Sequence, residues 1–305
     1  MLPDRQSASG EIDTGAKLAC LSCPTSFPEP VRRVDTVETH MSWVFLTDYH
    51  AYKLKKPVRL APFDARTLAS RRRYCYQEVR LNRRLAPDVY LGVVALCVDA
   101  GRRLRLGGEG VAVDWLVRMR RQPARDMLDH AIRAGTLRQD DVHRVAARLA
   151  AFYQAAAPVA IEPHAYRAGF ARDVDRNRRT LARRAYGLAP RPVRDLCAAQ
   201  QALLAARPDR FDERVAARRI VDGHGDLRPE HVCLQPQVCV IDCIEFAGAL
   251  RIVDPVDELG FLALECERLG GPAAGQQLLR SYGELTGFLH APQWRRRAET
   301  YPGLA

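Results

Sequence analysis

The stretch Ile220–Phe246 reads I-V-D-G-H-G-D-L-R-P-E-H-V-C-L-Q-P-Q-V-C-V-I-D-C-I-E-F, and it decides how the rest of the chain is interpreted. Two glycines flank His224, and Asp226 follows at a predicted loop tip, because glycine lets the backbone bend sharply. A strand-like segment starts at His231, and after a turn an apolar run ends in Asp242. A hairpin of this kind can bring Asp226 and Asp242 to the same end of a sheet.

These two carboxylates predict a site for chemistry. Two carboxylates that converge on one cleft can hold a divalent cation and can orient or deprotonate a hydroxyl group. Asp242 closes the run Val-Cys-Val-Ile, and a carboxylate beside such apolar residues needs a partner. A metal ion is one such partner.

Lysine is concentrated upstream of this stretch. The chain has 43 arginines and only 4 lysines, and three of the lysines are Lys53, Lys55 and Lys56. Arginine and lysine differ in shape and hydration, so the cluster indicates a specific need for ammonium groups, with chance in an arginine-rich chain as the alternative. Trp43–Leu46 and Ala51–Lys55 are predicted to form a hairpin. Side chains alternate along a strand, so Lys53 and Lys55 share one face.

A glutamate is predicted to face these lysines. A helix is expected from Asp64 or Thr67 to about Leu85, and Glu78 falls on its apolar stripe. A carboxylate on such a stripe should be paired. A Lys–Glu pair at the base of a cleft can fix an ammonium group against phosphate oxygens. The alternative is that Glu78 lies at the edge of the stripe and is solvated.

The order of patterns predicts an α+β fold with two lobes. Residues 1–33 carry turn formers without periodicity and are predicted to be a poorly ordered tail. Residues 34–121 are predicted to form a sheet-rich lobe with one helix, and its last strand is expected at Val111–Met119. Residues 122–293 are predicted to form a mainly helical lobe that carries the catalytic and metal-binding loops, and 294–305 a C-terminal tail. In this second lobe, apolar residues recur at helical spacing between Val142 and Tyr153, which predicts a buried helix.

Composition narrows the class of protein. The 305 residues are 47% hydrophobic and 27% charged, which is typical of a globular protein. No run approaches the roughly 18 apolar residues that span a bilayer, and the first thirty residues lack the apolar centre of a secretory signal. We therefore expect a cytoplasmic protein without a membrane partner. Nine scattered cysteines fit reduced thiols better than a disulfide framework.

The net charge of +11 admits nucleic acid as an alternative partner. Arginine clusters such as Arg71–Arg73, Arg178–Arg179 and Arg295–Arg297 motivate it. The chain contains no recognised nucleic-acid motif, and only 7% of its residues are aromatic. Most arginines fall at helical spacing and are interpreted as solvated faces, so nucleic-acid binding is not the expected function.

The order of lysine strand, glutamate helix, H-G-D loop and strand-terminal aspartate resembles the aminoglycoside phosphotransferase-like branch of the protein-kinase-like fold. The resemblance runs from about residue 34 to 290, and it implies an antiparallel N-terminal lobe and a mainly helical C-terminal lobe. Its motifs are Tyr52–Pro57 (Y-K-L-K-K-P), Glu78, His224–Leu227 (H-G-D-L), Ile241-Asp242 and Asp254–Leu259 (D-P-V-D-E-L).

The resemblance implies an ATP-dependent phosphotransferase that moves the γ-phosphate to a hydroxyl group of a small molecule. Asp226 would orient or deprotonate the acceptor, and Asp242 would hold Mg²⁺ on the nucleotide phosphates. Lys55, or else Lys53, would contact the α- and β-phosphates, with Glu78 holding that lysine. The segment from Val117 to Met119 would be the hinge that meets adenine, and His224 would be structural.

Three positions depart from the family's pattern. His231 stands where the family usually has asparagine as a second metal ligand, and imidazole is a poorer ligand for Mg²⁺, so Mn²⁺ is a further candidate. The expected phosphate loop, Val37–Ser42, has no glycine, and Glu258 replaces an aspartate. These departures leave open a nucleotide-binding, catalytically inactive regulatory protein.

The acceptor is expected to meet residues 166–218. The many arginines in this segment suit an anionic small molecule. Aminoglycosides are polycations, so antibiotic resistance is not the expected main role.

Overall fold

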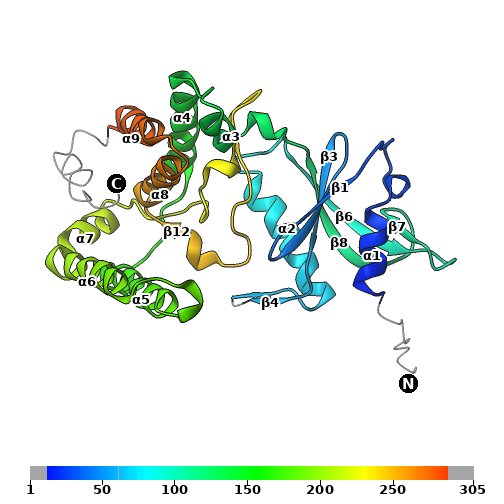
Figure 1. The fold of residues 1–305 in the computed structure, drawn as a ribbon, viewed down its shortest axis with the longest axis horizontal. Coiled ribbons are helices and arrows are strands. Elements are labelled where there is room, and N and C mark those ends of the chain that lie inside the picture. The colour runs from blue at the N-terminus through cyan, green and yellow to red at the C-terminus, as the bar shows by residue number, and fades with distance from the viewer. Residues whose placement is uncertain (1–11, 61, 288–305) are drawn as a thin grey trace.

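The computed structural model of the chain describes residues 12–60 and 62–287. A sheet with helices on both of its faces forms one lobe, and helices form most of the other (Figure 1). The α+β architecture predicted from the sequence is confirmed. None of the helices in the described part of the chain is long and apolar enough to cross a membrane.

The first lobe is built on a six-stranded sheet with the order β1-β2-β3-β8-β6-β7, in which all neighbouring strands are antiparallel. The predicted hairpin is β2–β3, and its register pairs Val44 with Lys53 and Ser42 with Lys55. A separate two-stranded ribbon joins β4 to β5. The strands are β1 (Asp35–Glu38), β2 (Ser42–Leu46), β3 (His50–Lys55), β4 (Arg59–Leu60), β5 (Phe63–Asp64), β6 (Tyr90–Val98), β7 (Leu104–Leu106) and β8 (Val111–Arg120).

Helix α2 (Leu68–Asn82) covers one face of this sheet. Its N-cap is Thr67, one of the two capping residues that the sequence predicts, and the Thr67 side chain accepts a hydrogen bond from the backbone N–H of Ser70. Its buried residues pack on the sheet through Cys75 and Val79, in a cluster that includes Ala51 and Val117 of the strands.

The opposite face of the sheet is covered by a segment that we predicted wrongly. Residues 12–33 are not a loose tail, because they contain α1 (Thr14–Leu21) and a 3₁₀ turn, Pro24–Ser26. Leu21 and Phe27 are buried against Phe45 and Tyr52 of the sheet. Short helices of this kind take their stability from tertiary packing, which local sequence patterns do not reveal.

A buried ion cluster also fixes this segment. The Lys17 ammonium donates to Asp114 of β8 at 2.8 Å, and Asp114 accepts two further hydrogen bonds from Arg71 of α2. All three residues are buried. Lys17, the lysine outside the cluster at 53–56, therefore links α1 to the sheet, and Asp114 extends this link to α2.

The second lobe is mainly helical, with two small strand pairs and short connecting segments. The pairs are β9 (Val221–Asp222) with β12 (Ile252–Val253), and β10 (Val232–Cys233) with β11 (Cys239–Val240). The helices are α3 (Leu128–Arg133), α4 (Gln139–Ala155), α5 (Pro163–Leu181), α6 (Pro190–Ala206), α7 (Pro208–Ala216), α8 (Pro255–Arg268) and α9 (Pro272–Thr286). The tail predicted for 294–305 lies outside the described residues.

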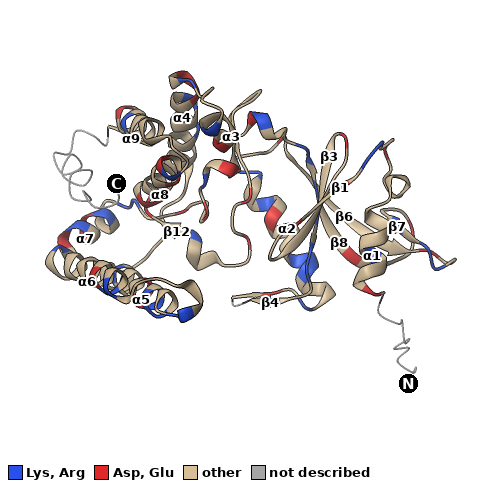
Figure 2. Cartoon of the chain, viewed as in Figure 1, with Lys and Arg blue, Asp and Glu red and all other residues tan. Residues whose placement is uncertain are grey.

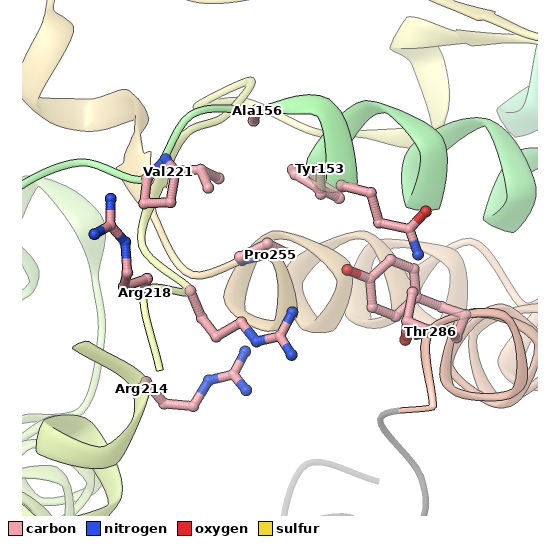
Figure 3. Close-up of a pocket in the computed structure, with 11 residues that line it drawn as sticks. Tyr153, Ala156, Arg214, Arg218, Val221, Pro255 and Thr286 are labelled. Carbon is pink, nitrogen blue, oxygen red and sulfur yellow. Dashed lines mark hydrogen bonds between the residues drawn. The ribbon is translucent and has the colours of Figure 1, made fainter. Parts of the chain in front are cut away.

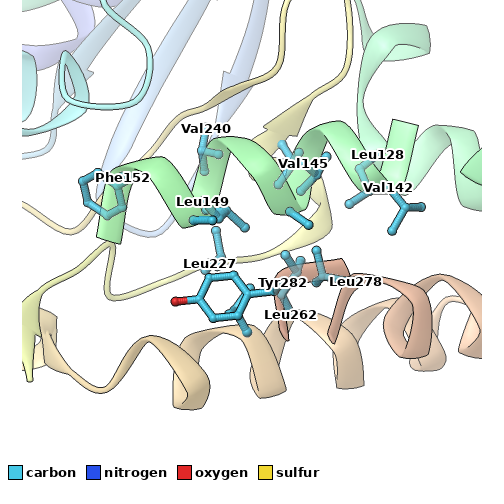
Figure 4. Packing of buried hydrophobic residues seen from close by; sticks show 14 of the residues in the cluster. Leu128, Val142, Val145, Leu149, Phe152, Leu227, Val240, Leu262, Leu278 and Tyr282 are labelled. Carbon is cyan, nitrogen blue, oxygen red and sulfur yellow. The ribbon is translucent and has the colours of Figure 1, made fainter. Parts of the chain in front are cut away.

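The core of this lobe forms where α4, α8 and α9 meet (Figure 4). The predicted apolar stripe of α4 is buried there, including Val145 and Leu149. Leu227 and Val240 extend the core from the H-G-D loop and the small hairpin. The loops that carry the candidate site are thus anchored in the hydrophobic core of the lobe.

The two lobes are joined by hydrogen bonds at the end of α2. Arg84 donates to the backbone oxygens of Asp222 and Gly223, each at 2.8 Å. The side-chain oxygen of Asn82 accepts from the backbone N–H of Cys243 at 2.9 Å. The C-terminal end of α2 is therefore bonded directly to the loops around the candidate site.

Candidate active site

The two lysines of β3 share one glutamate, but they face different surroundings. Lys55 Nζ lies 2.6 Å from Glu78 Oε2, and Lys53 Nζ lies 3.0 Å from Glu78 Oε1. Glu78 is fully buried, so its predicted pairing is confirmed and the solvated alternative is wrong. Burial alone would raise the pKa of Glu78, but the two ammonium groups lower it.

Both lysines reach the second lobe, but only Lys53 meets Asp242. Its ammonium lies 2.5 Å from Asp242 Oδ1, and the Lys53 side chain keeps 14% of its surface exposed. Burial alone would lower the pKa of Lys53, but Asp242 and Glu78 raise it well above its usual value. Lys55 is almost completely buried, so of the two alternatives left by the sequence, the geometry favours Lys53 for contact with a nucleotide.

Glu245 is a member of this cluster that the sequence analysis missed. Its carboxylate pairs with Lys55, and only 7% of its side chain is exposed. Two lysines facing one glutamate leave one positive charge without a partner, and this imbalance was the available signal for a second acidic group. The buried cluster therefore consists of Lys53, Lys55, Glu78 and Glu245.

Asp242 stands at a constrained position between the lobes. Its φ of 62° is left-handed, a conformation that aspartate tolerates better than most residues. The Asp242 backbone N–H donates to Tyr90 Oη at 3.0 Å. Burial would raise the pKa of the carboxyl group, but Lys53 and His231 hold it well below its usual range. Asp242 therefore stays ionised at neutral pH.

The carboxylate of Glu258 fixes the backbone of the H-G-D loop. It accepts backbone hydrogen bonds from His224, at 3.0 Å, and from Gly225, and it accepts the Tyr153 hydroxyl at 2.6 Å. A Cβ on Gly223 would lie 2.5 Å from Glu258 Oε2, so glycine is required for this approach. The glutamate that departs from the family's aspartate thus supports the loop that carries Asp226.

His224 is structural, as predicted. It is completely buried, its Nε2 donates to the Ile241 carbonyl at 2.8 Å, and its Nδ1 faces the Asp226 backbone N–H at 3.3 Å. Burial lowers the pKa of His224 to about 3, so the ring is neutral. It therefore joins the H-G-D loop to the strand segment that ends at Asp242.

Asp226 is partly exposed, to about the same extent as Asp242, whose side chain is 43% exposed. The Asp226 side chain is 40% exposed, and Arg228 Nε lies 3.0 Å from Asp226 Oδ1. Partial burial of the carboxyl group raises the pKa of Asp226, although the positive charges of His231 and Arg228 would lower it. A raised pKa makes a carboxylate a better proton acceptor.

His231 lies between the two aspartates. Its Nδ1 is 2.8 Å from the Asp226 backbone oxygen and 3.9 Å from Asp226 Oδ2, whereas its Nε2 is 3.7 Å from Asp242 Oδ2. Because a carbonyl oxygen can only accept, Nδ1 carries the hydrogen and Nε2 faces Asp242. The carboxylates of Asp226 and Asp242 therefore flank one imidazole ring, which is the convergence that the sequence predicts.

The described residues fit a cation that is held mainly by a ligand. No group of three or more His, Cys, Asp or Glu side chains in the described ranges is arranged to hold a metal ion by itself. Mg²⁺ usually takes one or two carboxylates and fills its other positions with phosphate oxygens and water. Asp242 supplies such a carboxylate, and Nε2 of His231 suits Mn²⁺ better than Mg²⁺.

The predicted hinge needs correction. Val117 is fully buried between the sheet and α2, opposite Lys53 in the register, and Met119 is opposite Ala51. Strand β8 continues to Arg120, because its pairing with β3 extends to His50. The lobes are therefore connected by residues 121–123, after the positions that we predicted.

The predicted phosphate loop is a tight turn without glycine. Thr39 Oγ1 donates to the Ser42 carbonyl and accepts from the Ser42 N–H, both at 3.0 Å. Hydroxyl bonding closes the β1–β2 turn, a role that short polar side chains often take.

The arginine clusters that suggested nucleic acid are largely engaged within the protein. Arg71 is buried against Asp114, and Arg72 stacks over Trp115. Arg178 and Arg179 lie close to Asp175. Acidic residues are interspersed with basic ones on α5 to α7 (Figure 2). Arg295–Arg297 lie outside the described residues.

The chain is similar to uncharacterized proteins in sequence and to solved structures in fold. No protein-family model matches the chain. Uncharacterized proteins of Mycobacterium tuberculosis and Mycobacterium bovis are each 32% identical over 257 residues, which is 83% of this chain and 50% of theirs. The chain thus spans about half the length of these curated relatives.

Two solved structures match most of the chain at low identity. A choline/ethanolamine kinase family protein from Mesorhizobium loti has a TM-score of 0.48 and 14% identity, over 88% of this chain and 76% of that chain. The aminoglycoside phosphotransferase APH(2'')-Ib in its ADP-bound form has a TM-score of 0.44 and 13% identity, over 89% of this chain and 82% of that chain.

Proposed function

We propose that the protein is an ATP-dependent phosphotransferase that acts on a hydroxyl group of a small molecule. One observation carries the proposal: the Lys53 ammonium lies between Glu78 and Asp242, and Asp226 lies across His231 from Asp242. Residues from four distant segments thus supply a phosphate-binding cation, a metal-binding carboxylate and a proton acceptor. Phosphoryl transfer needs little more than such positioning and charge stabilisation.

Each residue has a defined part in this proposal. Lys53 binds the α- and β-phosphates while Glu78 holds its ammonium group in place. Asp226 orients the acceptor hydroxyl and takes its proton as the oxygen bonds to the γ-phosphorus and the bond from that phosphorus to the bridging oxygen breaks, releasing ADP. A divalent ion on Asp242 supplies positive charge to the phosphate oxygens when bound.

The acceptor is proposed to be an anionic small molecule that enters beside α5–α7. This segment remains rich in arginine, and Arg214 fixes α7 to the start of α8 through paired hydrogen bonds to Asp254 at 2.5 and 2.7 Å. The acceptor would therefore meet a basic wall opposite the nucleotide.

Release of ADP with Mg²⁺ or Mn²⁺ tests the proposal, measured over a panel of sugar phosphates, hydroxy acids, amino alcohols, aminoglycosides and peptides. We expect a metal-dependent rate with at least one acceptor, and a decrease of about 100-fold to 10,000-fold in Asp226→Asn. An unchanged rate in Asp226→Asn would remove the catalytic role of this residue. Rapid turnover of a kanamycin-type acceptor would contradict the anionic class.

A second candidate is a nucleotide-binding protein that does not transfer phosphate. The contact between Arg228 and Asp226 favours it, because an ion pair occupies the carboxylate that should receive the acceptor proton. In this case an ATP analogue binds in a Lys53-dependent manner, but no acceptor on the panel increases ADP release. Arg228→Ala would leave such a protein inactive, whereas it would keep a measurable rate in a transferase.

A further inference from the structure

A cavity lies in the helical lobe (Figure 3). Its volume is about 280 Å³, which is near the lower end of the range for pockets that bind small molecules. Helices α4, α8 and α9, the end of α7 and strand β9 contribute to its walls. None of Lys53, Glu78, Asp226 or Asp242 lines it, so an occupant would not take part in phosphoryl transfer there.

The cavity has a basic side. Arg214, Arg218 and Arg219 line it, and none of the described lining residues is acidic. Arg214 is paired with Asp254. Within the described ranges, no ion pair is found for Arg218 or Arg219. The walls therefore carry an excess of two positive charges, which favours an anionic occupant.

The backbone holds these two arginines in an unusual way. Arg218 follows the end of α7 with a φ of 55°, a left-handed conformation that glycine or asparagine usually takes after a helix. Its neighbour Arg219 donates its backbone N–H to the Arg214 carbonyl at 3.0 Å, which closes the turn. An arginine that keeps a costly conformation at a cavity wall motivates a functional explanation.

Apart from the amide of Gln154, the remaining wall is apolar or carries hydroxyl groups. Tyr282 and Thr286 add hydroxyl-bearing side chains from α9. The apolar part of the lining consists of Ala156, Pro158, Val221 and Pro255. A phosphate on a hydrophobic body would satisfy both sides, because guanidinium groups bind phosphate oxygens and the apolar wall gains from displaced water.

We propose that this cavity, the α7–α9 pocket, is a second ligand site for a small phosphorylated molecule with an apolar or ring-shaped body. The pocket shares no residue with the nucleotide cluster, so its binding can be measured without turnover. It shares Arg214 with the segment proposed to meet the acceptor, and the test therefore changes Arg218 and Arg219 and leaves Arg214 in place.

Phenyl phosphate is the probe, and isothermal titration calorimetry with the full chain is the measurement. An excess of a non-hydrolysable ATP analogue with Mg²⁺ keeps the nucleotide cluster occupied. We expect saturable binding to the unaltered protein, and a loss of affinity of at least about tenfold in the double variant Arg218→Glu, Arg219→Glu. Inorganic phosphate, which cannot use the apolar wall, should bind about tenfold more weakly than phenyl phosphate.

The control is a double variant with the same charge change in the turn between β6 and β7. Arg102 and Arg103 are both exposed there and Arg102 has a φ of 60°, like Arg218, so Arg102→Glu, Arg103→Glu should bind phenyl phosphate as the unaltered protein does. A milder pair, Arg218→Gln, Arg219→Gln, covers the case in which charge reversal impairs folding, and it should also weaken binding. Equal affinity in the pocket and control variants, competition with the ATP analogue, or equal affinity for both phosphates would overturn the proposal.

Discussion

The buried cluster between the lobes and the support beneath the H-G-D loop both stabilise buried carboxylates, but by different means. In the cluster, full charges of opposite sign compensate each other: Lys53 and Lys55 against Glu78 and Glu245. Beneath the loop, a single carboxylate is held by backbone N–H groups and a hydroxyl group, and the adjacent His224 is neutral. The first arrangement should fail when one charge is removed, and the second when protons are added.

The largest effect should come from breaking the ionic cluster. Glu78→Ala leaves two buried ammonium groups with less compensation, so we expect the free energy of unfolding to decrease by about 3–5 kcal/mol. Chemical denaturation measures this decrease. The control Glu38→Ala removes the partner of Lys56 at a site where the glutamate is 65% exposed, and it should change the free energy of unfolding far less. A similar decrease of the unfolding free energy in both variants would mean that burial does not make the Glu78 cluster more important for stability than the exposed Glu38–Lys56 pair.

The two lysines should separate structure from function. Lys55→Met leaves Glu245 buried without its partner, and we expect the free energy of unfolding to decrease by about 3 kcal/mol. Lys53→Met should cost less stability, because its side chain is partly exposed, but should weaken binding of an ATP analogue about tenfold. Denaturation and calorimetry on both variants test this. The reverse pattern would return the phosphate-binding role to Lys55.

The smallest of these effects is a pH dependence that belongs to the loop support. Folded His224 has a pKa of about 3, against 6.5 for an ordinary histidine, so between these values only the unfolded chain binds the proton. The contribution of His224 to stability is therefore complete above about pH 6.5, and it decreases by up to about 1.4 kcal/mol per pH unit as the pH falls.

Unfolding free energies at pH 7, 6 and 5 measure this slope. His224→Gln should flatten the curve, whereas His143→Gln, at an exposed position of α4, should leave it unchanged. A curve that His224→Gln does not flatten would show that another group governs the acid response.

Local patterns were sufficient to predict the β2–β3 hairpin, α2 and the stripe of α4, because each of these elements buries one periodic face. The same periodicity could not separate Lys53 from Lys55, because both side chains leave the strand on one face. Only the docking of the second lobe decides which of them meets Asp242.

Other parts depended on tertiary contacts with no local signal. Helix α1 is eight residues long and is stabilised by Lys17 and Leu21 against the sheet, so its own sequence could not predict it. The end of β8 was placed too early, because pairing with β3 carries that strand to Arg120. Glu245 was missed because its partner, Lys55, is distant in sequence.

The hydrogen bonds at the end of α2 bear on which parts of the molecule can move as one rigid unit. Arg84 and Asn82 tie this helix to loops of the helical lobe, whereas Lys53 meets that lobe through a single ion pair with Asp242. Separating the sheet from that lobe would also break the Lys55–Glu245 ion pair and the hydrogen bond from the Asp242 N–H to Tyr90. Helix α2 packs on the sheet and pairs Glu78 with both lysines, so we expect the sheet and α2 to move as one body, and any opening between the lobes must break both sets of contacts.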